Sequence, residues 1–316
     1  MNPYWGQDFF GFFTILFRRL TGQLPLEHLA SDEVQLLVLM GVALSTILLG
    51  TFLTLKKMTM MANSLSHTTL LGIVICYLIF FIPQSNLGAD LNVDMKILFL
   101  AALISAVLTT LLTELARDLL KLQEDAAIGL VFTTLFAVGI ILVTVFTRNS
   151  HIGVEAITGN VDALHPEDIR LAWGTAFINL AAIGLFFRQW VMTAFDEKLS
   201  FSLGIPIRVF HYLMMFLTAL TLIAAFRAVG VLLVLSFLAG PTLIARQWTH
   251  RLVPLLLAGV GLGLLASMIG VALSRHFLSS YHMPLSTGGL VVTLISFFYL
   301  VSTLLTFRAT RGLIRH

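Results

Sequence analysis

The sequence predicts an all-α protein that crosses a membrane about nine times. Of its 316 residues, 58% are hydrophobic and only 11% are charged. The mean hydropathy is +0.96, which is typical of polytopic membrane proteins rather than of soluble domains. The apolar residues form runs of roughly 20, the length that a helix needs to cross about 30 Å of hydrocarbon. No soluble domain of ordinary size fits in the remaining chain.

The apolar runs place the individual spans. The first run, Phe9–Leu20, is too short to cross, and its Phe-rich pattern ending in two arginines predicts an interfacial helix. If this run inserts instead, the span count becomes ten, and we expect a range of eight to ten. We therefore divide the chain into an N-terminal interfacial segment (1–33), a transmembrane domain (34–307) and a basic inner tail (308–316). The predicted spans are Val34–Leu55, Thr69–Pro83, Met95–Leu115, Ala126–Phe146, Leu171–Phe187, Val209–Phe226, Ala228–Ala245, Leu252–Ser274 and Leu285–Phe307.

Two of these spans depart from a simple apolar helix. The second follows a polar stretch, and the seventh contains Gly240-Pro241, which we expect to kink or break a helix.

The positions of lysine and arginine predict the orientation of the chain. Inner loops carry more of these residues than outer loops do, and the bias here places the C-terminus inside. An odd number of spans then places the N-terminus outside. The inner set is Lys56, Lys57, Arg117, Lys121, Arg188, Lys198, Arg208, Arg246, Arg251, Arg308, Arg311 and Arg315, and the outer loops hold Lys96, Arg148, Arg170, Arg227 and Arg275. The outer loops Gln84–Asp94 and Asn149–Glu167 carry acidic residues instead.

The sequence contains no motif of a soluble enzyme. It has no G-x-x-x-x-G-K-[ST] to hold ATP phosphates, no H-E-x-x-H for zinc and no G-x-S-x-G nucleophile elbow. The single cysteine, Cys76, lies within a predicted span, and we interpret it as a small buried hydrophobic residue. Catalysis by this chain is therefore not expected, and no cofactor bound by it is predicted.

The stretch Met58–Tyr77 has the composition that most suggests a functional site. It reads MTMMANSLSHTTLLGIVICY and contains no charged residue. Asn63 and His67 are four positions apart, so on a helix they share one face with Cβ atoms about 5–6 Å apart. A histidine within a membrane is costly and indicates function by default. The alternative is a polar pair hydrogen-bonded across a helix interface.

The depth of these two residues depends on the backbone that follows Lys57. Asn63 comes six residues later, which is about 9 Å if the chain is helical. An extended backbone would place Asn63 roughly twice as deep. Both arrangements remain open at this stage.

The longest inner loop, Arg188–Arg208, has the pattern of a short docking helix. Ala194–Leu203 is predicted to be amphipathic, with Phe195, Leu199 and Leu203 on one side. Gly204 then ends the helix, and Pro206 prevents it from resuming. A capped helix with exposed apolar residues at the inner membrane surface fits a groove in another protein. A connector lying on the lipid surface would have the same periodicity.

Three stretches make the chain resemble a known family. They are MTMMANSLSHTTLLGIVI, which is similar to the family pattern Met-Gly-Asp-Ala-x-Ser-His-Ala-x-x-x-Gly; QEDAAIGLVFTTLFAVGIIL, from Gln123 to Leu142; and the segment from Phe195 to Leu252. The family is that of the permease subunits of divalent-metal ABC importers, which bring zinc, manganese or iron into bacteria. The three stretches occur in order across Met58–Leu252.

The resemblance implies partners, a location and site residues. It implies a multi-pass protein of the bacterial inner membrane that acts with a second permease, two cytoplasmic ATPases that use ATP, and an extracytoplasmic metal-binding protein. His67 matches the family histidine on the metal path, whereas Asn63 stands where the family has aspartate, so the carboxylate charge is missing. The resemblance further implies that Ala194–Gly204 is the ATPase-coupling helix, with Phe195, Asp196, Glu197, Leu203 and Gly204 as coupling residues.

Three further polar residues are expected to be structural. Glu124 and Asp125 favour a helix N-terminus through the macrodipole, and His211 is expected at the inner interface.

Two rival functions stay open beside metal import by a permease. An ion-gradient-driven carrier is one, but it would show internal repeats or buried charges, and only Glu114 lies near a span interior. A non-transporting membrane scaffold is the other, and in such a scaffold His67 would be dispensable.

Overall fold

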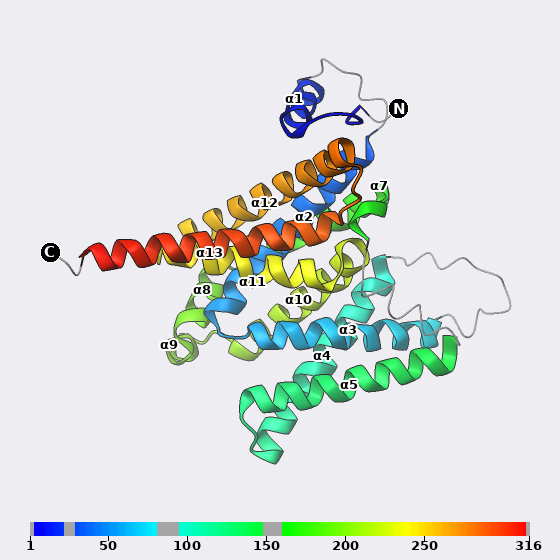
Figure 1. The fold of residues 1–316 in the computed structure, drawn as a ribbon. Helices are drawn as coiled ribbons and strands as arrows, with labels where there is room; N and C mark the ends of the chain where they lie inside the picture. Colours follow the sequence, from blue (N-terminus) through cyan, green and yellow to red (C-terminus); the bar gives the residue numbers. More distant parts are fainter. Residues whose placement is uncertain (1–2, 22–28, 81–94, 148–159, 314–316) are drawn as a thin grey trace. The chain divides into compact units, whose positions relative to one another are not determined.

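In the computed structural model, the described residues form helices (Figure 1). It describes residues 3–21, 29–80, 95–147 and 160–313. The predicted loop Gln84–Asp94, most of Asn149–Glu167 and the last residues of the tail lie outside these ranges. The α-helices are α1 (Phe9–Leu20), α2 (Ser31–Leu55), α3 (Thr59–Phe80), α4 (Met95–Leu120), α5 (Glu124–Thr147), α7 (Pro166–Leu185), α8 (Phe187–Phe195), α9 (Glu197–Ser202), α10 (Ile207–Val229), α11 (Val231–Trp248), α12 (Leu252–Tyr281) and α13 (Thr287–Leu313), with a short 3₁₀ helix η2 (Val161–Ala163).

The all-helical class predicted from the sequence is confirmed, and the described residues contain no strand. Six helices within the described residues are long and apolar enough to span a membrane, and the pair α7 and α8, bent by 76°, adds a seventh if it is one span. α3 and α4, with 22 and 26 residues, overlap two more predicted spans, although α3 begins ten residues before the predicted start at Thr69. The helices therefore fit the expected range of eight to ten.

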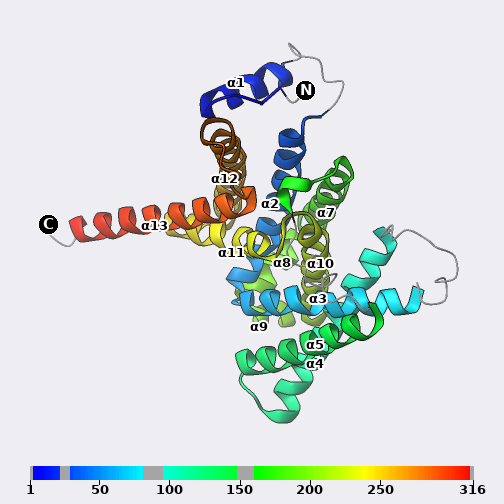
Figure 2. The same cartoon turned by 45° about the vertical axis from the view of Figure 1, so that its right-hand side comes forward.

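The chain forms two compact units, and each is described by itself. Unit 1 comprises residues 1–51, 160–176 and 228–316, and unit 2 comprises residues 52–159 and 177–227. In unit 1, α11, α12 and α13 pack against one another (Figures 1 and 2). α2 approaches α11 closely at Gly50, where a Cβ atom would collide with the backbone carbonyl of Leu238. The hydroxyls of Thr51 and Thr242 lie 3.1 Å apart at the same contact.

Of the kink or break expected at Gly240-Pro241, the break does not occur. α11 runs without interruption from Val231 to Trp248 and contains Pro241 in its interior. Gly240 instead allows α13 to approach, because a side chain there would meet Ile295. Helix packing thus accounts for the glycine.

The N-terminal helix α1 has the bounds predicted for the interfacial helix, Phe9–Leu20. One of its faces is buried through Phe12 and Arg19, whereas Phe10, Phe17 and Arg18 are exposed. The Arg19 Nε atom lies 2.7 Å from a carboxylate oxygen of Glu33, and the Tyr4 hydroxyl donates to the same carboxylate at 2.8 Å. This amphipathic helix is therefore fastened to α2 by buried polar contacts; its location at a membrane surface stays a prediction.

In unit 2, the helices α3, α4 and α5 pack side by side. Figure 1 shows them in cyan to green. An apolar cluster joins them, formed by Leu71, Ala116, Ala127, Val131 and Leu135. On α7 and α10 of the same unit, the Asn179 side-chain amide donates to the Thr221 hydroxyl at 2.7 Å, and both residues are buried. Such pairing satisfies a polar group within a span.

A tight turn leads from α2 into α3 and settles the conformation that the sequence left open. Lys57 has φ of 60°, its N–H donates to the Thr54 carbonyl at 3.2 Å, and the Met58 N–H donates to the Leu53 carbonyl at 2.8 Å. These two bonds are those of a Schellman motif, which ends one helix and redirects the chain. α3 then begins at Thr59, so the polar lead-in is helical and an extended lead-in is wrong.

Candidate functional site

α3 places Asn63 and His67 one turn apart, as the sequence predicted. Both side chains are half-buried, and four positions on a helix bring them to one face. Both belong to unit 2, and α3 packs against α4 on one side and α5 on another. The helix therefore holds an amide and an imidazole together within a segment that contains no charge.

The His67 ring packs against two aromatic rings of α5. Its centroid lies 5.3 Å from that of Phe132 and 5.3 Å from that of Phe136. Its ring nitrogens make no hydrogen bond with any residue that the structure describes. A hydrogen-bonded histidine across a helix interface is therefore not what the described residues contain. Two apolar neighbours instead hold an imidazole whose lone pair is available to a ligand.

The hydroxyl groups of the same stretch have a different role from His67. The Thr109 hydroxyl of α4 donates to the Thr68 hydroxyl at 2.8 Å, and the Ser105 hydroxyl reaches the Thr68 carbonyl at 3.5 Å. Gly72 allows this close approach, because a Cβ there would collide with Ser105. Within Met58–Tyr77, Thr68 thus joins α3 to α4, whereas the His67 imidazole packs against α5.

Within the described ranges, no three His, Cys, Asp or Glu residues are grouped closely enough to hold a metal ion. The α3 site contains one imidazole and one neutral amide, and neither carries a formal charge as a ligand. A desolvated divalent cation requires carboxylate or thiolate charge, or several more oxygen ligands. This site alone can therefore hold a divalent ion only weakly.

The inner segment 188–208 forms two short helices where we expected one. α8 ends at Phe195 and α9 begins at Glu197, because Asp196 adopts an extended conformation with φ −147° and ψ 99°. The Asp196 side chain accepts a hydrogen bond from the Leu199 N–H at 2.9 Å. The single helix Ala194–Leu203 was therefore wrong. An aspartate at this place caps a new helix more favourably than it continues the old one.

Gly204 ends α9 as the sequence predicted. Its φ is +74°, its N–H donates to the Phe201 carbonyl at 3.0 Å, and the Ile205 N–H donates to the Ser200 carbonyl at 3.0 Å. This is a second Schellman motif, and the left-handed conformation favours glycine. Pro206 follows, and α10 begins at Ile207.

Four apolar side chains are exposed on this segment, and we call them the α9 patch. Phe201 is the most exposed at 78%, and it was missed by the periodicity of four that predicted the others. The residue before Phe201, Ser200, is fully buried, and its hydroxyl donates to the Asp196 carbonyl at 2.8 Å. Ser200 therefore faces the interior of the unit, and Phe201 faces outward. The α9 patch consists of Phe195, Leu199, Phe201 and Leu203.

Trp190 fastens α8 to the rest of unit 2. It is fully buried, its indole N–H donates to the Ala182 carbonyl at 3.2 Å, and its ring lies 5.6 Å from Phe210 of α10 and 6.0 Å from Phe52. Trp190 therefore anchors α8 within unit 2, and the exposed α9 patch follows it in the chain.

The remaining candidates are structural or lie outside the described residues. The side chains of Glu124 and Glu197 are in the latter group, although these residues open α5 and α9. Glu114 accepts a hydrogen bond from the Tyr212 hydroxyl at 2.9 Å, which explains an acid near the end of a span. His211 is half-buried next to this pair, and it stays a predicted interfacial residue.

Comparison with known proteins identifies the family. The model of the ABC 3 transport family matches residues 33–306. The chain belongs to this family. The family assignment confirms the resemblance on which the sequence analysis relied, and it makes the chain a membrane transport subunit rather than an enzyme.

Relatives cover nearly the whole chain. A probable metal transport system membrane protein of Chlamydia muridarum is 38% identical over 307 residues, covering 97% of this chain and 95% of the relative. The manganese transport system membrane protein MntD of Bacillus subtilis is 31% identical over 246 residues, covering 74% of this chain and 79% of the relative.

A solved structure shares the architecture of this ABC 3 family chain. PsaBC from Streptococcus pneumoniae, determined in complex with Fab, matches with a TM-score of 0.70 and 26% identity. The match covers 85% of this chain and 90% of that chain. The permease fold expected from the sequence is thereby confirmed.

Proposed function

We propose that this chain is the permease of an ATP-driven importer that carries a divalent first-row metal, with manganese as the first candidate and iron and zinc as the others. The family match over residues 33–306 carries the proposal, and relatives named as manganese or metal transport proteins support the class of substrate. The permease acts in the bacterial inner membrane with two cytoplasmic ATPases, a second permease and an extracytoplasmic metal-binding protein.

The metal passes by Asn63 and His67 in this proposal. The His67 imidazole supplies a nitrogen ligand, and the Asn63 amide supplies a carbonyl oxygen or orients a water molecule. Because neither group brings negative charge, the charge comes from the partner permease, or the site stays weak so that metal leaves it quickly. Because Asn63 stands where the family has aspartate, we favour a partner permease whose sequence differs from that of this chain.

The α9 patch couples transport to ATP hydrolysis. Four exposed apolar side chains on and beside a helix with defined ends fit a hydrophobic groove on an ATPase. Asp196 and Gly204 fix the two ends of α9, so a displacement of the ATPase moves the helix as a body. Trp190 then transmits that displacement to α10, which shifts access from one side of the membrane to the other.

Metal uptake in vesicles tests the path. The permease is reconstituted with its candidate partners, and uptake of radioactive manganese, iron and zinc is measured with and without ATP. We expect ATP-dependent uptake of one metal, lost in His67→Ala and slowed by tighter retention in Asn63→Asp. A control variant, Ser296→Ala, changes an exposed polar residue of unit 1 and should leave uptake unchanged. Uptake that does not depend on ATP would indicate a gradient-driven carrier and reject the proposal.

ATPase binding tests the coupling segment separately. Phe201→Ser removes the most exposed side chain of the α9 patch, and we expect it to weaken co-purification of the ATPase without lowering the amount of folded permease. The matched control is Phe177→Ser, because Phe177 is 71% exposed on α7 of the same unit. Equal ATPase recovery with both variants would contradict the coupling assignment.

A further inference from the structure

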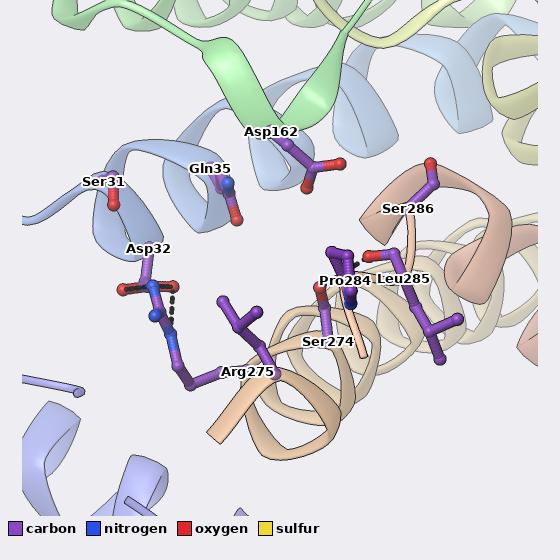
Figure 3. Close-up of a pocket in the computed structure, with 10 residues that line it drawn as sticks. Ser31, Asp32, Gln35, Asp162, Ser274, Arg275, Pro284, Leu285 and Ser286 are labelled. Atoms are coloured by element: carbon purple, nitrogen blue, oxygen red, sulfur yellow. Dashed lines mark hydrogen bonds and ion pairs between the residues drawn. The ribbon is translucent and has the colours of Figure 1, made fainter. Parts of the chain in front are cut away.

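Unit 1 contains a polar cavity that the proposed path does not use. The cavity encloses about 410 Å³ between the first turn of α2, the helix η2, the last turns of α12 and the segment that leads into α13 (Figure 3). Its polar lining comes from Ser31, Asp32, Gln35, Asp162, Arg275 and Ser286. Under the orientation predicted from lysine and arginine positions, all of these residues lie at the outer end of their helices.

Two of the charged groups in the cavity cancel each other. The Arg275 Nε atom donates to one Asp32 carboxylate oxygen at 2.9 Å, and its Nη2 atom donates to the other at 2.6 Å. Both side chains are buried. Since the guanidinium is occupied by this carboxylate, an anion in the cavity would find no free positive charge there.

Asp162 leaves the cavity with one net negative charge. One of its carboxylate oxygens accepts a hydrogen bond from the Thr287 hydroxyl at 2.6 Å, and the N–H of Asp162 is held by the Asn160 side chain at 3.1 Å. The carboxylate is directed into the cavity in Figure 3. Asp162 therefore has a fixed orientation and a second oxygen available to a ligand.

Gln35 provides an independent sign of a ligand. Its side chain is only 8% exposed, it makes no hydrogen bond with any described residue, and its amide points into the cavity (Figure 3). A buried amide without a partner is costly. The cavity is the space into which the Gln35 carbonyl and N–H groups can direct their hydrogen bonds.

We propose that this cavity binds a hydrated divalent cation through oxygen atoms. The carboxylate of Asp162 and the amide carbonyl of Gln35 are the main ligands, and serine hydroxyls hold the water shell. Hard cations such as Mn²⁺, Mg²⁺ and Ca²⁺ prefer carboxylate, carbonyl and water oxygens. At about 30 Å³ per water molecule, the cavity has room for an ion with its hydration shell. It would act as an outer waiting site for the metal, a role that rests on the proposed function.

Mn²⁺ binding to the full-length permease in nanodiscs of zwitterionic lipid tests the site. Electron paramagnetic resonance distinguishes free from bound Mn²⁺, so the ion itself is the probe. We expect Asp162→Asn to weaken binding at this site by about tenfold or more, because it removes the uncancelled charge. Gln35→Leu, which keeps the size and removes the amide, should act in the same direction. Excess Ca²⁺ should displace Mn²⁺ from an all-oxygen site.

The matched control is Glu167→Gln, which removes one negative charge from an exposed residue at the start of α7. It should leave Mn²⁺ binding unchanged. Binding by Asp162→Asn equal to that of Glu167→Gln, or Mn²⁺ retained against excess Ca²⁺, would overturn the proposal. Asp162 is exposed, so its substitution tests the site even where Gln35→Leu lowers stability.

The waiting site and the path can fail separately. His67→Ala should keep the Mn²⁺ binding that depends on Asp162, because the two residues belong to different units. Wild-type uptake that does not depend on ATP, with this binding intact, would reject the proposed function and leave the cation site standing. If the wild type takes up metal normally but shows no Mn²⁺ binding that depends on Asp162, the cation site is rejected and the proposed function stands.

Discussion

The α2–α12 end of unit 1 and the α8–α9 segment of unit 2 use their residues in opposite ways. In unit 1, Asp32 and Glu33 are buried and paired with Arg275 and Arg19. In unit 2, the α9 patch leaves apolar side chains such as Phe201 exposed. Buried charged residues are unusual, because burying a charge is costly unless it is paired.

The two regions differ in where these side chains find their partners. Buried charges that find partners within the chain form a closed structure that fixes α1, α2 and α12 to one another. The exposed apolar residues of the α9 patch have no such charged partners, and in the proposed function an ATPase covers them. The first region should therefore respond to substitution through stability, and the second should respond through assembly with the ATPase.

The largest expected effect is on the closed network. Arg275→Ala removes the guanidinium and leaves the Asp32 carboxylate buried without it, which costs about 3–5 kcal/mol in the free energy of unfolding. Thermal unfolding in detergent measures the loss. Arg251→Ala is the control, because Arg251 is exposed at the start of α12, and it should change stability by no more than about 0.5 kcal/mol.

A second variant sharpens this prediction. Combining Arg275→Met with Asp32→Leu replaces both charges by apolar groups and should recover most of the lost stability. If Arg275→Ala unfolds at the temperature of Arg251→Ala, the ion pair does not hold the helices together and the contrast between the two regions disappears.

A smaller effect on stability is expected at Gly204. Gly204→Ala places a Cβ on a residue with φ +74°, which costs roughly 1–2 kcal/mol locally. Because that cost falls on the end of α9, ATPase stimulation should fall much more than the melting temperature of the permease. Metal-stimulated ATP hydrolysis in the assembled importer is the measurement.

Gly184→Ala is the matched control for Gly204. Gly184 lies in α7 with open space around its Cβ position, so alanine there should be neutral or slightly stabilising. Equal ATPase activity in the two variants would show that the α9 end does not need its present conformation.

The smallest effect concerns Tyr4 at high pH. Burial and then the hydrogen bond to Glu33 raise the pKa of the Tyr4 phenol above its usual value of about 10. Above pH 10 the unfolded chain loses this proton first, so the stabilisation is complete below pH 10 and declines as the pH rises further. We expect Tyr4→Phe to lose about 1 kcal/mol less stability than the wild type between pH 9 and pH 11.

Denaturant unfolding at the two pH values checks this prediction. Lysines and other alkaline groups titrate equally in both proteins and cancel in the comparison. A wild type and a Tyr4→Phe variant that lose stability in parallel would place the Tyr4 hydroxyl in water rather than against Glu33.

Much of the fold could be predicted from the sequence, because bilayer thickness sets the length of an apolar helix. The bounds of α1 were predicted to the residue, and every predicted span overlaps a helix, although α3 begins at Thr59, ten residues before the predicted second span. The pairing of Asn63 with His67 on one face also followed from helical geometry alone. Periodicity could not decide how Asp196 behaves, because an aspartate can continue a helix or cap the next one.

The sequence by itself determined the class, the spans, the segment that holds Asn63 and His67, and the glycine that ends α9. These features are local, since they depend on hydrophobicity, helical spacing and the φ angle of single residues. Only the tertiary structure decided that Pro241 stays within a helix, that His67 meets Phe132 and Phe136, and that Asp32 pairs with Arg275. These features depend on contacts between residues far apart in the chain, and no local pattern specifies which helices meet.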